Sequence, residues 1–135
     1  MQIEFQKAMQ QLVVNQTLNL KEISKFSAVD FRLGIQWLVT EEQPDLAQAL
    51  AEAGLALFPM SEDILAISGL LAMTREDWPL AIELLQDLFS LQKDRVQPMT
   101  CQMLARALAC NLDIAEAHQV LDQAMKLWPN NPELE

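Results

Sequence analysis

Three segments of this chain share one pattern of small and large apolar residues, and their spacing limits the fold more than any other feature. The alanines at matching places, Ala47, Ala81 and Ala117, lie 34 and 36 residues apart. A fixed period of about 20 to 50 residues is typical of proteins in which each unit stacks on its neighbours. The second interval is two residues longer, and residues 93–98 form the polar stretch where this insertion fits. We therefore expect stacked repeats.

The composition of the repeats favours helix over strand. Apolar residues make up 51% of the chain, chiefly Leu and Ala, and there are only three Gly and no Tyr. Ala, Leu, Met, Gln and Glu lose little side-chain freedom in a helix, whereas strands prefer β-branched and aromatic residues. The sequence therefore predicts an all-α fold.

Residues that begin helices recur along the chain. Ser27 precedes Asp30 as a capping box, and Ser61 precedes two acids that suit the positive end of a helix. Three prolines stand where the first helical turn needs no N–H group, namely Pro44, Pro79 and Pro98. The predicted helices span residues 28–41, 44–58, 62–74, 78–92, 98–110 and 114–128.

In the second helix of each unit a small residue recurs, a larger apolar residue follows, and a proline ends two of the three units. These roles fall to Ala47, Gly54, Leu57 and Pro59, then to Ala81, Leu85 and Leu88, and then to Ala117, Leu121, Ala124, Leu127 and Pro129. The chain here resembles the tetratricopeptide-repeat (TPR) family, whose two-helix unit has a period of about 34 residues. The resemblance covers about residues 28–132 and implies a short superhelix of three helix-turn-helix units, over about 28–61, 62–97 and 98–131. Lys93 departs from the family pattern, which has proline there.

Residues 1–26 match no repeat, so the repeat domain is taken as residues 27–135. One side of a helix over about residues 3–15 is apolar, and this N-terminal extension is expected either to cap the first repeat or to act as a dimerisation arm. Attachment to a membrane is disfavoured because the polar side carries little positive charge. The last helix has a polar stripe, as a terminal repeat needs, made by Glu116, Gln119, Gln123 and Lys126.

The formal net charge of −10 disfavours nucleic acid and anionic membranes, which need clustered Lys and Arg. Between Arg32 and Arg75 there are acids but no basic residue, which indicates either a solvated surface or a patch for a basic partner. No signal-peptide pattern precedes the repeats, and no apolar run reaches the roughly 18 residues of a membrane span. Cys101 and Cys110 lie too far apart in one predicted helix for a disulfide, so we expect reduced thiols and a cytoplasmic protein.

The sequence offers no catalytic site. His118 is the only histidine, so no triad and no metal site with two histidines can form. A glycine-rich phosphate loop is absent, and adjacent acids such as Glu41 and Glu42 are interpreted as helix-end chemistry. We therefore expect neither an enzyme nor a cofactor nor a bound metal.

The TPR resemblance implies a partner-binding groove lined by the first helix of each unit. Carried onto this chain, the candidate residues are Arg32, Gln36, Val39, Ala66, Leu70, Met73, Met99, Gln102, Arg106 and Cys110. An apolar, methionine-containing lining suits an apolar peptide segment. The alternative is that several of these methionines fill the core under the N-terminal helix.

Three functions remain open. Small size, acidity and an N-terminal helix outside the repeats make the chain resemble, loosely, the TPR-type chaperones of bacterial type III secretion, which cradle translocator or needle components. In this hypothesis the groove would bury an apolar segment of the partner. A second hypothesis is a scaffold or adaptor module that grips a carboxylate through Arg32 and Arg106. A third is a homo-oligomeric assembly element whose N-terminal helix docks into a neighbour's groove.

Overall fold

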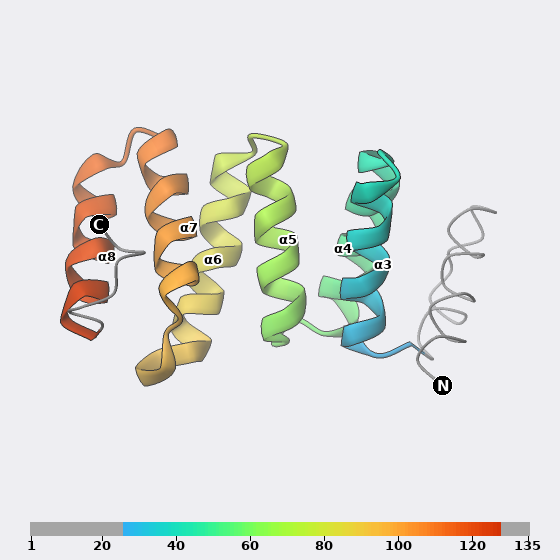
Figure 1. The fold of residues 1–135 in the computed structure, drawn as a ribbon, viewed down its shortest axis with the longest axis horizontal. Helices are drawn as coiled ribbons and strands as arrows, with labels where there is room; N and C mark the ends of the chain where they lie inside the picture. Colours follow the sequence, from blue (N-terminus) through green and yellow to red (C-terminus); the bar gives the residue numbers. More distant parts are fainter. Residues whose placement is uncertain (1–25, 128–135) are drawn as a thin grey trace. The chain divides into compact units, whose positions relative to one another are not determined.

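The computed structural model describes residues 26–127, and in that part the regular structure is helical, with no strand (Figure 1). The α-helices are α3 (Ala28–Thr40), α4 (Pro44–Leu57), α5 (Glu62–Thr74), α6 (Trp78–Gln92), α7 (Pro98–Cys110) and α8 (Ile114–Leu127). A short 3-10 helix, η1 (Lys93–Arg95), follows α6. The all-α prediction is confirmed, and every predicted helix end that falls within residues 26–127 is within one residue of the observed one. The predicted extension over residues 1–26 lies outside the described residues, apart from Phe26.

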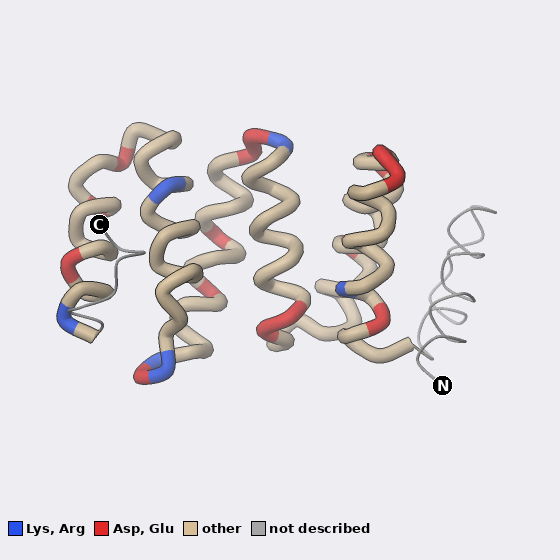
Figure 2. Tube along the Cα trace, viewed as in Figure 1, with Lys and Arg blue, Asp and Glu red and all other residues tan. Residues whose placement is uncertain are grey.

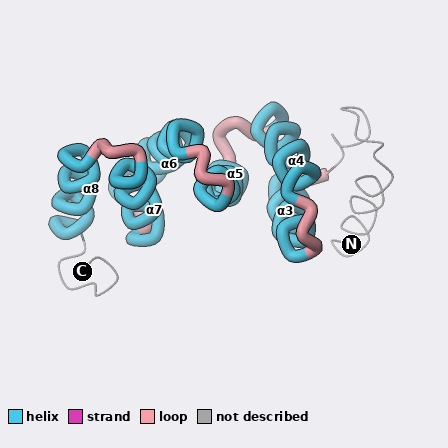
Figure 3. Tube along the Cα trace, turned by 90° about the horizontal axis from the view of Figure 1, so that it is seen from above, coloured by secondary structure: helices cyan, strands magenta, loops and turns pink. Residues whose placement is uncertain are grey.

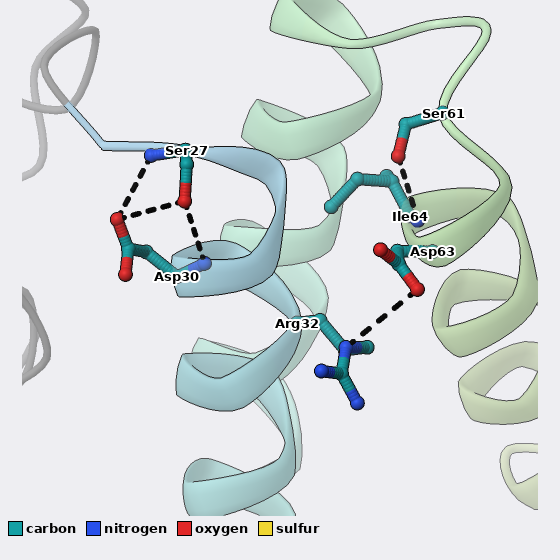
Figure 4. A network of polar contacts seen from close by, with 6 residues as sticks. All are labelled: Ser27, Asp30, Arg32, Ser61, Asp63 and Ile64. Carbon is teal, nitrogen blue, oxygen red and sulfur yellow. Dashed lines mark hydrogen bonds and ion pairs between the residues drawn. The ribbon is translucent and has the colours of Figure 1, made fainter. Parts of the chain in front are cut away.

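The helices begin where the sequence chemistry indicates. Ser27 Oγ accepts a hydrogen bond from the Asp30 N–H at 3.2 Å, and Asp30 Oδ2 accepts one from the Ser27 N–H at 2.9 Å (Figure 4). This reciprocal capping box satisfies two N–H groups that a helix start otherwise leaves without partners. At the start of α5, Ser61 Oγ accepts a longer hydrogen bond, 3.4 Å, from the Ile64 N–H. Local side-chain chemistry therefore accounts for these two boundaries.

The same turn joins the two helices of each pair. Its central residue has a left-handed backbone, at Glu42 (φ 58°), Glu76 (φ 60°) and Leu112 (φ 68°). The N–H of the next residue donates to the carbonyl five residues earlier, from Gln43 to Leu38, from Asp77 to Ala72 and from Asp113 to Leu108, at 2.8 to 2.9 Å. This is the hydrogen bond of a Schellman helix end. Because the three turns recur at intervals of 34 and 36 residues, the structure repeats one helical hairpin three times.

The chain divides into two compact units, Met1–Ile67 and Ser68–Glu135. In the first, α3 packs along α4 (Figure 3). Phe31, Ile35 and Leu50 are fully buried. The ring of Phe31 packs edge to face against the ring of Phe58, with the two ring centroids 5.8 Å apart. Gly54 of α4 lies against Phe31 and Ile64, so its small size permits the close packing.

In the second unit, α6 packs against α7 and α7 packs against α8. Val96, which follows η1, is buried in a cluster with Cys101 of α7 and Ala124 of α8, against which Phe89 of α6 also packs. The intervals between first-helix starts are 34 residues from α3 to α5 and 36 from α5 to α7. The predicted two-residue insertion is therefore confirmed between the start of α6 and the start of α7, where η1 lies.

Candidate partner-binding face

The candidate face in the first unit is at the surface. Gln36 and Val39 on α3 are exposed, with Val39 at 48%, while the Arg32 side chain is 35% exposed. Ala66 on α5 is half-buried. The side chains of Gln36 and Val39 therefore lie on the side of α3 away from its buried residues, where a partner has access to them.

Most of the candidate residues in the second unit are also exposed. Leu70 on α5 is 45% exposed and Met99 on α7 is 65% exposed, which are large values for apolar side chains. Arg106 and Cys110 on α7 are exposed and Gln102 is half-buried. The α7 side of the face therefore combines one large apolar side chain with polar ones.

Met73 is different from the other candidates, because its side chain is only 9% exposed. It follows the buried residues Leu71 and Ala72 on α5. Met73 is therefore a core residue, as one alternative in the sequence interpretation allowed, whereas Met99 is not.

The structure brings one candidate residue into contact with a second charge. Arg32 Nε on α3 lies 3.8 Å from Asp63 Oδ1 on α5 (Figure 4). This separation is too long for a hydrogen bond, and Arg32 Nε is buried with no hydrogen-bond partner. Asp63 is the second residue of α5, a place that the TPR resemblance also implies for a groove residue. A carboxylate ligand at Arg32 would therefore compete with Asp63.

Charged residues gather at the ends of the described helices (Figure 2). The exposed acids Glu41, Glu42, Glu76 and Asp77 lie in the hairpin turns. Acids in first helical turns, such as Asp45 in α4 and Glu62 in α5, interact favourably with the helix dipole. Much of the acidity therefore lies at helix ends, while the first-helix faces carry the exposed apolar residues.

The two cysteines have different environments. Both are free; Cys101 is buried and Cys110 is exposed on the candidate face. Burial raises the pKa of the Cys101 thiol, so its reactive thiolate form is disfavoured. Among residues 26–127, no three His, Cys, Asp or Glu side chains are grouped to hold a metal ion. The helices of that range are also too short or too polar to cross a membrane.

Comparison with protein-family models gives no match, and no curated protein matches the sequence. The resemblance to the TPR family therefore stays a prediction that rests on the residues of the three units.

Proposed function

We propose that this protein binds a segment of another polypeptide along the exposed faces of its first helices and catalyses no reaction. One observation carries the proposal: each first helix exposes a large apolar side chain on the predicted face, Val39 on α3, Leu70 on α5 and Met99 on α7. Single exposed apolar residues are common on any surface, but their recurrence on each of the three first helices favours a binding role for these helix faces.

The partner that suits these faces best is an apolar segment that aggregates when free. Burying it against Leu70 and Met99 of the second unit, or against Val39 of the first, would remove apolar area from water, which contributes about 25 cal/mol per Å². The net charge of −10 would keep the complex in solution. These features support a small acidic chaperone of the cytoplasm, and the loose resemblance to secretion chaperones makes a secretion-related partner our first hypothesis.

An adaptor that grips a carboxylate is the second candidate function. The observation in its favour is Arg32 Nε, which lacks a hydrogen bond while its ion pair with Asp63 is loose at 3.8 Å. A carboxylate ligand would offer the two parallel hydrogen bonds that a guanidinium accommodates. The exposed Arg106 would supply a second charge. We rank this function below the chaperone because Asp63 already neutralises part of the Arg32 charge.

Affinity capture from a cytosolic extract of the source organism separates the two functions. The bait is the full chain as wild type, as Leu70→Glu and as Ala49→Glu, where Ala49 is an exposed residue of the second helix α4. The chaperone function predicts one apolar, stoichiometric partner that stays bound at about 0.5 M salt, where charge interactions are screened within a few Å. Leu70→Glu should lose this partner and Ala49→Glu should keep it.

Other outcomes of the capture experiment count against the proposal. Loss of the partner at high salt and on Arg106→Gln would favour the adaptor. Recovery of the protein alone, in association with itself through residues 1–26, would favour the homo-oligomeric assembly element and contradict partner binding.

A further inference from the structure

The helix α8 has an apolar row that the described helices leave half-open. Ile114 is 50% exposed and Met125 is 47% exposed, while the side of α8 against α7 is made by the buried Ala117 and Ala124. Ile114 and Met125 are about three helical turns apart and so lie on one side of α8. His118 and Leu121 stand between them, which gives intervals of four, three and four residues along one row.

The equivalent row in the preceding hairpin is covered. The turn residues Glu76 and Leu112 are 36 residues apart, and the same shift carries the row on α8 back to α6. The residues there are Trp78, Ile82, Leu85 and Phe89, of which Leu85 is fully buried and the others are half-buried. Phe89 packs against the cluster that contains Cys101 of α7. On α6 this row is therefore covered by α5 as well as by α7, since Leu85 packs against Gly69 of α5 and Phe89 against the Cys101 cluster. On α8 the two ends of the row, Ile114 and Met125, stay half-exposed.

The spacing of the row makes it complementary to itself. The spacing of the four residues, at intervals of four, three and four, is the same from either end of α8. In an antiparallel pair of α8 helices, each residue of the row therefore lies opposite a residue of the same row in the second copy. Ile114 then faces Met125 of the second copy, and the reverse contact forms at the other end. A two-fold axis produces every contact twice, as in the commonest class of protein dimer.

The polar edge of the row fits the same arrangement. Asp122 lies one helical turn beyond His118 on this edge, and both side chains are exposed. A two-fold axis perpendicular to the helices keeps this edge on the same side in both copies. Asp122 of the second copy then comes beside His118, displaced along the axis by about one residue rise, 1.5 Å. A parallel pair would instead place this polar edge against the apolar edge that carries Leu121.

We propose that α8 is a self-association surface, on which two copies of the chain pack this helix antiparallel. One helix pair is a small interface, so the expected dissociation constant is in the micromolar range, about 10 to 100 µM. Added salt strengthens the dimer, because it screens the repulsion between two copies that each carry −10. This surface is separate from the first-helix faces of the proposed function, so either can fail without the other.

Sedimentation velocity on the full chain tests the surface. Over about 5 to 500 µM, which brackets the affinity of such an interface, the average mass should rise from 15.3 kDa toward twice that value. Met125→Glu should stay at 15.3 kDa. Gln123→Glu adds the same charge on the polar side of α8 and should associate as the wild type does. A wild-type chain that stays monomeric throughout, or equal loss of association in both variants, would overturn the proposal.

Disulfide trapping tests the direction of the pair in a Cys110→Ser background. The double variant Ile114→Cys, Met125→Cys should form disulfide-linked dimers on mild oxidation. Its two cysteines cannot bridge within one helix, since they are about 16 Å apart and a disulfide needs Cα atoms within about 7 Å. Each single variant should stay unlinked. Linkage by Ile114→Cys alone would show a parallel pair, and dimers lost only on deletion of residues 1–25 would place the interface elsewhere; either result overturns the proposal.

Discussion

A methyl group placed on Gly69 of α5 would come within 2.9 Å of Cδ2 of Leu85 on α6. Cγ of Leu85 would be 3.1 Å away, so rotation of the leucine tip alone does not relieve the contact. Leu85 is fully buried. The close packing of α5 on α6 in the second unit therefore depends on the missing side chain at Gly69.

We predict that Gly69→Ala lowers the free energy of unfolding by about 1 kcal/mol. Alanine gains about 1 kcal/mol of helix propensity over glycine, but overpacking a full core costs about 1 to 3 kcal/mol. Urea denaturation measures the change, and a raised midpoint would contradict the packing described here. Two controls locate the cause. Gly69→Ala should cost less in a Leu85→Ala background, and Gly54→Ala should cost less because its nearest neighbour, Phe31 Cδ1, would be 3.2 Å away.

Leu112→Gly should raise the stability of the third hairpin. Leu112 has φ 68° and an 84% exposed side chain, so it bears left-handed strain without gaining burial. Left-handed backbone costs an L-residue about 1 to 2 kcal/mol, and glycine avoids that cost at a helix end. After the entropy that glycine loses on folding, we expect a net gain of about 0.5 to 1 kcal/mol in thermal or urea unfolding. Leu112→Ala keeps the Cβ atom and should bring no such gain; equal gains in both variants would show that exposure, not strain, is the cause.

The stability should fall in alkaline solution through Cys101. Burial raises the pKa of its thiol above the ordinary value of 9.0, and a backbone hydrogen bond offsets this only in part. The unfolded chain therefore loses its proton first as the pH rises through 9.0. The contribution of Cys101 is complete below that pH and is lost above it. Urea titrations from pH 7 to pH 10 should show a steeper decline for the wild type than for Cys101→Ala, while Cys110→Ser should follow the wild type. Parallel profiles for the wild type and Cys101→Ala would contradict this account.

Removing the ion pair of Arg32 should barely change the fold. The side chains of Arg32 and Asp63 are 35% and 52% exposed and lie 3.8 Å apart, so solvent screens their attraction. Exposed pairs contribute about 0 to 1 kcal/mol, and we expect Asp63→Asn to change the unfolding free energy by less than about 0.5 kcal/mol. If the adaptor function were right, the same variant would free Arg32 and tighten carboxylate binding. Isothermal titration with a short peptide ending in a free carboxylate distinguishes the cases, and the chaperone function predicts no change.

The helix limits could be predicted from sequence because the signals that set them are local. The capping box of Ser27 and Asp30 and the first-turn prolines Pro44 and Pro98 act within one helical turn. The repeat spacing was also predictable, because each hairpin repeats the same packing of small residues such as Ala47, Ala81 and Ala117, all buried. The left-handed residues Glu42, Glu76 and Leu112 were not, since none has the glycine or asparagine that usually marks such a turn.

Residues whose role depends on a neighbouring helix could not be predicted in the same way. Leu70 and Met73 are three residues apart on α5, yet one is exposed and the other buried, because tertiary packing covers one side of that face. On α8 the polar stripe, including Gln119 and Gln123, is exposed as expected. The expectation that α8 closes the array with a polar outer side was incomplete, because Ile114 and Met125 are half-exposed as well. An amphipathic pattern shows an apolar side but not whether anything covers it.

The most direct test of the central claim is the affinity of the captured partner for Leu70→Glu, measured by isothermal titration beside Ala49→Glu. Placing a charge in an apolar contact surface typically costs about 2 kcal/mol or more, so Leu70→Glu should bind at least about 30-fold more weakly than the wild type. Ala49→Glu should bind as the wild type does, and both variants should keep the wild-type helical circular dichroism. Equal affinity for Leu70→Glu and Ala49→Glu would contradict the assignment of the first-helix faces as the partner-binding surface.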